Sequence, residues 1–174
     1  MSSSLRFAPM PLAVLDEPFD HDGFIFELKY DGFRALADVG RGCCRLISRN
    51  HHEFTTFPEL CAAIGQALPG QLVLAGEIVY LGKDGCPRFY DLLRRRAPQY
   101  VYAFDLLWKD DQDLRGLPLI KRKRLLKKMV KSPVLFLDHL VGRGVDLFQA
   151  ACQRDLEGIV AKAAQGLYQP EKTT

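Results

Sequence analysis

The segment FIFELKYDGFRALADV, residues 24–39, alternates apolar with polar or charged side chains and is interrupted by Asp31 and Gly32. A period of two is typical of a half-buried β-strand, so Glu27 and Lys29 are expected together on the face opposite the aromatic side chains. An Asp-Gly pair is a strong turn signal. The predicted elements are a strand, a turn and two further strands of an antiparallel meander, over residues 24–30, 31–32, 33–39 and 43–50.

The rest of the chain contains more strands than helices. Strands are predicted over residues 71–81, 100–108, 134–140 and 156–163, and helices over residues 55–70, 117–130 and 146–155. Because helices do not alternate regularly with strands, the pattern favours an α+β fold with mainly antiparallel sheets flanked by helices. The 174 residues are enough for a single domain over residues 1–174, with flexible termini expected at 1–7 and 169–174.

Composition narrows the class of protein. The chain is 48% hydrophobic and 26% charged with a net charge of +3, which is typical of a globular protein that tolerates a polyanionic partner. Five cysteines without a C-x-x-C pair argue against a disulfide framework or a zinc site. There is no signal peptide and no long apolar run, so we expect a cytoplasmic protein without a membrane partner.

Two segments concentrate positive charge. Residues 121–131, KRKRLLKKMVK, contain seven basic side chains and no acid, and residues 93–97 contain three arginines. Such runs usually form a solvated helix face, but they also suit contact with phosphates. The sequence leaves both interpretations open.

Isolated charges interrupt several apolar strands. A buried acid or lysine is costly unless it is paired or functional. Any one of them has an ordinary structural explanation in an ion pair, but together they predict a shared polar cleft. A lysine there is nucleophilic only as the free amine, and acids there suit Mg²⁺. The chain has no G-x-x-x-x-G-K-[ST] motif, so nucleotide binding would use the sheets. The interrupting charges are Glu27, Lys29, Glu77, Asp105, Glu157 and Lys162.

A series of short motifs resembles the covalent nucleotidyltransferases. The motifs are KYDGFR (29–34), SRN (48–50), AGEIVYL (75–81), YAFDLLW (102–108) and EGIVAK (157–162). K-x-D-G alone is a weak signal, but these motifs in this order are specific. They are most similar to ATP-dependent DNA ligases, in particular the ligase module of bacterial end-joining ligases, over residues 8–168. The resemblance implies an ATP-grasp-like nucleotidyltransferase fold.

The resemblance also implies roles for individual residues. Lys29 would attack the α-phosphate of ATP and carry AMP covalently, releasing pyrophosphate, and Glu27 would lie by the adenine amino group. Phe104 would stack on adenine, although simple core packing also explains an aromatic residue there. The implied nucleotide-binding residues are Glu27, Arg34, Arg49, Glu77, Phe104 and Lys162, and the implied Mg²⁺ ligands are Glu77 and Glu157.

The spacing of one motif constrains the local backbone. Glu157 and Lys162 are five residues apart, which places them on opposite faces of a straight strand. Both reach one cleft only if Glu157 lies in the turn before the strand or a bulge intervenes. Gly158 makes the turn the natural interpretation.

The sequence departs from the family pattern in two places. Ala75 stands where the third motif commonly has aspartate, which affects local hydrogen bonding more than chemistry. The 174 residues also show no match to the family's K-x-K element or its OB-fold domain. The expected substrate is nicked or broken double-stranded DNA in repair or recombination at the bacterial nucleoid. We therefore expect sealing to need an OB-fold domain or end-joining proteins in trans.

Two alternatives remain at this point. One is a non-catalytic module that binds nucleotide or DNA through the same cleft. The other is a related enzyme, an RNA ligase or a capping-type nucleotidyltransferase that uses GTP. Glu27 and the flanks of Lys29 favour ATP and DNA.

Overall fold

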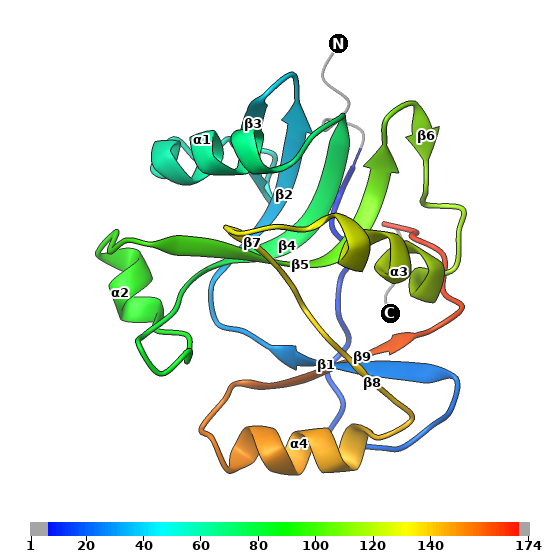
Figure 1. Ribbon diagram of the computed structural model, residues 1–174. Coiled ribbons are helices and arrows are strands. Elements are labelled where there is room, and N and C mark those ends of the chain that lie inside the picture. The colour runs from blue at the N-terminus through cyan, green and yellow to red at the C-terminus, as the bar shows by residue number, and fades with distance from the viewer. Residues whose placement is uncertain (1–6, 171–174) are drawn as a thin grey trace.

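A computed structural model describes residues 7–170 and contains two β-sheets that face each other (Figure 1). The larger sheet has the order β3-β2-β4-β5-β6, with β7 also paired to β5. The smaller sheet has the order β8-β1-β9. All pairs are antiparallel except β5 with β7, which confirms the predicted α+β class with mainly antiparallel sheets.

The strands correspond closely to the apolar segments of the sequence. The larger sheet comprises β2 (Phe33–Gly40), β3 (Cys43–Ser48), β4 (Leu72–Tyr80), β5 (Gln99–Lys109), β6 (Gln112–Asp113) and β7 (Val134–Phe136). The smaller sheet comprises β1 (Phe24–Lys29), β8 (Leu140–Val141) and β9 (Gly158–Ala163).

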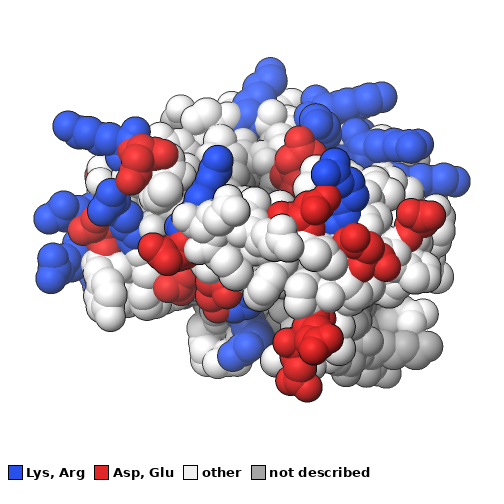
Figure 2. All heavy atoms as spheres, turned by 90° about the horizontal axis from the view of Figure 1, so that it is seen from below, with Lys and Arg blue, Asp and Glu red and all other residues white. Residues whose placement is uncertain are grey.

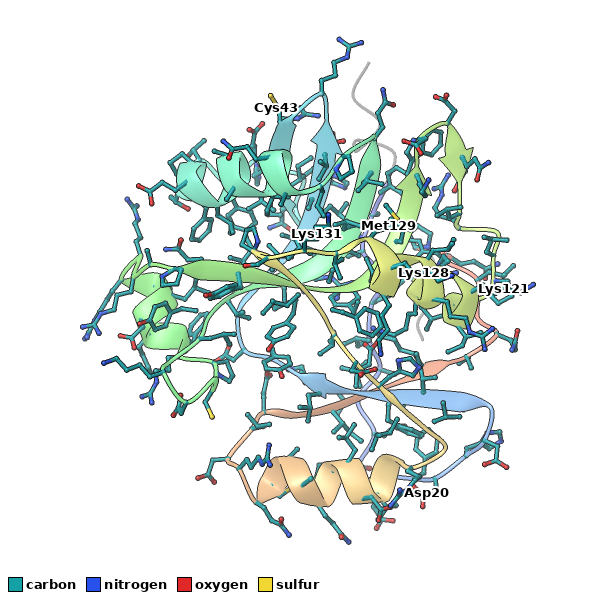
Figure 3. The ribbon with its side chains drawn as sticks, viewed as in Figure 1. Asp20, Cys43, Lys121, Lys128, Met129 and Lys131 are labelled. Carbon is teal, nitrogen blue, oxygen red and sulfur yellow. The ribbon has the colours of Figure 1, made fainter. Side chains whose placement is uncertain are left out.

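Helices cover the outer faces of both sheets. In Figure 1, α1 lies by β3 at the upper left, α3 lies in front of β5, and α4 lies beneath the smaller sheet. Asp20, labelled in Figure 3, caps α4 by accepting a hydrogen bond of 2.9 Å from the Val145 amide. The helices are α1 (Pro58–Ala67), α2 (Phe89–Leu93), α3 (Leu119–Met129) and α4 (Gly144–Cys152).

The larger sheet is buried on both faces. Ala35, Ala37 and Val39 of β2 pack with α1 and α3, whereas Leu36 packs into a second cluster on the opposite face. Phe7 belongs to this second cluster and is only 2% exposed. The flexible segment expected at residues 1–7 therefore does not extend to Phe7. Residues 1–6 and 171–174 lie outside the described part of the chain.

The predicted meander is wrong at its first connection. β1 pairs with β8 and β9, whereas β2 pairs with β3 and β4 in the other sheet. Asp31 and Gly32 therefore carry the chain from one sheet to the other instead of closing a hairpin. A Cβ on Gly32 would lie 2.2 Å from the Ile78 carbonyl oxygen, so glycine is needed there for close backbone approach.

Two other segments differ from the sequence prediction. The single strand predicted over residues 134–140 is split, with β7 in the larger sheet and β8 in the smaller one. Helix α2 was not predicted, since five residues show too little periodicity to reveal a helix. In the described range, none of the helices has both the length and the apolar character needed to span a membrane.

Candidate functional site

A cavity of about 280 Å³ lies between the two sheets. It is open to solvent and is lined from both sides, so charges on distant parts of the sequence meet across it. Of the predicted site residues, all but one line this cavity: Glu27, Lys29, Arg34, Glu77, Phe104, Glu157 and Lys162. The sequence prediction of one shared polar cleft therefore agrees with the geometry of the structure.

Lys29 stands at the C-terminal end of β1, on the wall formed by the smaller sheet. Its ammonium group donates a hydrogen bond to the Glu157 carboxylate. Glu157 immediately precedes β9, and Gly158, with φ of 145°, makes the turn that brings it to this side. The predicted turn position of Glu157 is thus confirmed. Both side chains are about two-fifths exposed, at 41% and 42%, so a ligand in the cavity can reach them.

Glu27 precedes Lys29 by two residues and therefore lies on the same face of β1. Unlike Lys29, it is buried, with an exposed fraction of 1%. Its two oxygens accept hydrogen bonds of 2.5 Å from Lys123 and 2.5 Å from Lys162. Burial alone would raise the pKa of Glu27, but Lys162 and Lys123 outweigh it and hold the pKa below its ordinary value. Glu27 is therefore a buried, ionised group with both oxygens engaged.

Arg34 projects from β2 on the opposite wall, and its guanidinium carbon lies 4.1 Å from the centre of the Phe104 ring. Its Nε atom is buried and has no hydrogen-bond partner among the described residues. Burial lowers the pKa of Arg34, while neighbouring groups, Glu77 among them, oppose the change. A buried donor without a partner is costly, so this position suits an anionic or acceptor group of a ligand.

Phe104 is an extra residue in β5. Ala75 of β4 pairs with Asp105 and Gly76 pairs with Ala103, so Phe104 has no counterpart and forms a β-bulge. The bulge allows both Phe104 and Asp105 to line the cavity although they are neighbours in the chain. Lys162 lies 4.2 Å from the Phe104 ring centre, so two cations pack against this aromatic ring.

Glu77 lies opposite Arg34 in the pairing of β4 with β2. Burial raises the pKa of Glu77 to about 7, against the opposing effects of Arg34 and Lys29. The carboxyl group is consequently poised to exchange a proton, or to accept a cation, near neutral pH.

Two buried cations on α3 were not predicted from the sequence. Arg122 and Lys123 are 2% and 1% exposed, although they belong to the basic run that was expected to face solvent or phosphates. The helical spacing contained the signal, because Leu119, Arg122, Lys123 and Leu126 recur at i, i+3, i+4 and i+7, the spacing of one buried helix face. The other basic side chains of the run are exposed, which fits both a solvated face and contact with phosphates.

Arg122 forms a buried ion pair with Asp105. Its Nε and Nη2 atoms donate to the two Asp105 oxygens at 2.8 and 2.9 Å, and Nη1 donates to the Leu117 carbonyl. Asp105 thus has a structural explanation. The pair ties α3 to the larger sheet, while Lys123 ties the same helix to the smaller one.

Arg49 does not join the cavity. It is exposed in the turn after β3, and it is absent from the residues that line the site. The exposed basic side chains gather elsewhere, at the left of Figure 2 over α2 and at its upper right over α3. Lys121, Lys128 and Lys131, labelled in Figure 3, lie along α3 and the segment after it.

The donor set for a metal ion is limited. Within residues 7–170, no group of three or more His, Cys, Asp or Glu side chains is arranged to hold a metal by itself. Glu77 and Glu157 both line the cavity and offer oxygen atoms. One or two carboxylates together with substrate phosphates are the usual environment of Mg²⁺, so this set fits an ion that arrives with a nucleotide.

Comparison with known proteins gives a consistent family. Residues 13–174 match the model of the ATP dependent DNA ligase domain. The chain is 33% identical over 174 residues to the SPbeta prophage-derived DNA ligase-like protein LigB of Bacillus subtilis, covering 95% of this chain and 63% of that protein. It is 34% identical over 149 residues to the multifunctional non-homologous end joining DNA repair protein LigD of Mycobacterium tuberculosis, covering 83% of this chain and 20% of that protein.

Solved structures agree with the sequence relatives. The ligase domain of M. tuberculosis LigD superposes with a TM-score of 0.85 at 30% identity, covering 97% of this chain and 57% of that chain. A mycobacterial DNA ligase D complexed with ATP and MES superposes with a TM-score of 0.82 at 26% identity, covering 97% of this chain and 58% of that chain. The chain therefore spans less than two thirds of the length of these relatives.

Proposed function

This chain belongs to the ATP-dependent DNA ligase domain family, and from that premise we propose that its cleft transfers AMP from ATP to Lys29. Lys29 first passes a proton from its ammonium group to the Glu157 carboxylate that accepts its hydrogen bond. The free amine then attacks the α-phosphorus: a nitrogen–phosphorus bond forms, the bond from the α-phosphorus to the bridging oxygen breaks so that pyrophosphate leaves, and the nitrogen releases a second proton to solvent. The lysyl-AMP then supplies the adenylyl group for joining DNA strands in repair.

The placement of Lys29 opposite Arg34 carries this proposal. Lys29 is a two-fifths exposed amine on one wall, and Arg34 on the other is a partly buried cation whose Nε atom is buried without a hydrogen-bond partner among residues 7–170. An anionic group held by Arg34 and Lys162 would offset the cost of burying unpaired charge and would lie within the same cavity as the nucleophile. Glu157 orients the Lys29 side chain through its hydrogen bond.

The other predicted site residues have compatible roles. Phe104 and Glu27 line the cavity and would contact an adenine base between the sheets, and Glu77, which pairs with Arg34, would contact ribose. Glu77 and Glu157 would hold Mg²⁺, which would neutralise phosphate charge when bound. Arg49, which is exposed and outside the cavity, would have to contact a ligand that extends beyond it.

Complete strand sealing requires two further steps after adenylation. The two later steps act on nicked or broken double-stranded DNA, and we propose that they require an OB-fold domain or end-joining proteins in addition to the cleft. Action on chromosomal DNA would place the protein in the bacterial cytoplasm.

Labelling with α-³²P-ATP and Mg²⁺ tests the adenylation step. The folded protein should retain acid-labile label after denaturation, and Lys29→Ala should abolish it. Lys109→Ala is the matched control, because Lys109 is 39% exposed and also forms an ion pair with a neighbouring acid, but lies outside the cavity. Lys109→Ala should label like the wild type.

A non-catalytic module would give a different result. If calorimetry detects ATP binding that Lys29→Ala does not change, and no label is retained by the folded wild type, the cleft binds nucleotide without forming an adduct. Preferential labelling by GTP would instead point to a capping-type activity.

A further inference from the structure

Lys123 is a fully buried lysine that the adenylation chemistry does not use. Its side chain is 0% exposed, and it is not among the residues that line the cavity. It donates to Glu27 at 2.5 Å and to the Leu137 carbonyl at 2.8 Å, with the Phe104 carbonyl 3.4 Å away. It thereby contacts β1, β5 and the segment that joins the two sheets.

The hydrogen bonds of Lys123 indicate that it is charged. Three acceptors surround its nitrogen, and only an ammonium group has three hydrogens to donate to them. A neutral amine would turn its lone pair towards one of these oxygens. Burial lowers the pKa of Lys123, but the adjacent Glu27 carboxylate opposes this effect.

Glu27 therefore faces two ammonium groups, one buried and one at the cavity. Lys123 occupies one oxygen from the side of α3, and Lys162 occupies the other from β9. Since one negative charge is shared between two positive charges, the trio retains a net positive charge. Lys162 lines the cavity and is 16% exposed, so this surplus charge is presented to a ligand.

We propose that Lys123 is a positioning residue that frees Lys162 for an anionic ligand. Lys123 balances the negative charge of Glu27 from the side of α3, away from the cavity. Glu27 therefore does not depend on Lys162 as its counter-ion. Lys162 can then turn from Glu27 and the Phe104 ring towards a phosphate group. This inference rests on the proposed nucleotide site and extends it to a residue outside the cavity.

Loss of Lys123 should strengthen the hold of Glu27 on Lys162. In Lys123→Met, Glu27 would have Lys162 as its sole cationic partner, and the pair would be neutral and tightly held in a buried environment. In the double variant Glu27→Gln, Lys123→Met, both buried charges are removed together. The positive charge of Lys162 is then no longer balanced by a carboxylate at position 27. Removal of the Glu27 charge should therefore reverse the loss that Lys123→Met causes by itself.

The test compares affinities for ATP and adenosine without Mg²⁺, so that no covalent step intervenes. Their ratio isolates the phosphate contribution from changes in the adenine contacts. We expect Lys123→Met to lower the ATP-to-adenosine affinity ratio by about tenfold, the scale of one partly screened charge, and the double variant to restore it to within about threefold of wild type. Leu126→Ala, at a buried position of the same helix, controls for lost stability and should leave the ratio unchanged.

Each outcome separates this inference from the adenylation proposal. An unchanged ratio in Lys123→Met, or an equal loss in Lys123→Met and the double variant, would overturn the role of Lys123 even if the wild type forms the adenylate. The predicted pattern without adenylate would support Lys123 and overturn the adenylation proposal. A folded wild type that does not bind ATP would overturn both.

Discussion

Arg34 is the residue at which the charge of the cavity is least balanced. Its guanidinium packs on Phe104 and its Nε atom has no partner within the described part of the chain. An unsatisfied buried donor costs about 1–3 kcal/mol, and more for a charged group. Glu27, by contrast, is a buried charge whose two partners, Lys123 and Lys162, belong to the protein itself. An acceptor group of a ligand would supply the hydrogen-bond partner that the Nε atom of Arg34 lacks.

Glu77 should make stability depend on pH. Its folded pKa of about 7 lies above the ordinary value of 4.5, so the folded state binds the proton more tightly. This contribution is fully present below about pH 4.5 and is lost as the pH rises through about 7. Glu77→Gln should therefore gain stability relative to wild type between pH 5 and pH 8, by up to about 3 kcal/mol.

Urea unfolding of both proteins at the two pH values measures this difference. The comparison cancels the other titrating groups, which the two proteins share. If the difference in free energy of unfolding between Glu77→Gln and wild type is the same at pH 5 and pH 8, Glu77 is not perturbed as described.

At the scale of elements, the connection from β1 to β2 carries the chain from the wall that bears Lys29 to the wall that bears Arg34. Gly32 passes so close to the Ile78 carbonyl that a side chain there would push the connecting segment away from β4. Gly32→Ala should lower the free energy of unfolding by about 1–3 kcal/mol, as overpacking does, and should also slow adenylation. Chemical denaturation and the labelling assay measure the two effects.

Gly116 provides the matched control for this substitution. A Cβ there meets no atom within 4 Å and its φ is not positive, so Gly116→Ala should change stability by less than about 0.5 kcal/mol. Equal stability of the two alanine variants would show that the close approach at Gly32 does not matter.

The sequence allowed the strands and most of the cavity to be predicted, because alternation in β1 and isolated charges in apolar strands are local signals. The sheet to which each strand belongs could not be predicted, because it depends on contacts between residues far apart in the chain. The Asp-Gly turn signal is the same for a hairpin and for a crossing, and contact with Ile78, far along the chain, selects the crossing. The bulge at Phe104 was equally hidden, since an unbroken apolar segment has no periodicity to interrupt.

Helix α3 contains buried charges that could not be predicted from the sequence, for a different reason. Six of its eleven residues are basic, and charge normally marks a solvated face. The buried positions of Arg122 and Lys123 depend on their acidic partners on β5 and β1, which the sequence separates from the helix by 17 and 96 residues. Helical spacing with Leu119 and Leu126 identifies the inner face, but only the fold supplies the partners.

At the scale of the whole molecule, two sheets joined by crossing segments form a cleft, and α3 connects them through two buried ion pairs. The adenylation that we propose would take place in this cleft. We expect nick sealing by the chain with an added OB-fold domain to exceed sealing by the chain alone by about tenfold or more, because a second DNA-binding module raises avidity. Adenylation and gel-based sealing assays on the same samples measure the two steps.

The comparison separates the contribution of the cleft from that of the OB-fold domain. A control with Lys29→Ala in the presence of the OB-fold domain should seal nothing. Equal sealing with and without the added domain would contradict the division of labour between the two modules.

Peptide mass spectrometry of the protein after incubation with ATP and Mg²⁺ identifies the residue that accepts AMP. We expect an adenylyl group on the peptide that contains Lys29, at Lys29 itself. An adenylyl group on Lys162 or another lysine, or an unmodified Lys29 in folded protein shown to bind ATP, would contradict it.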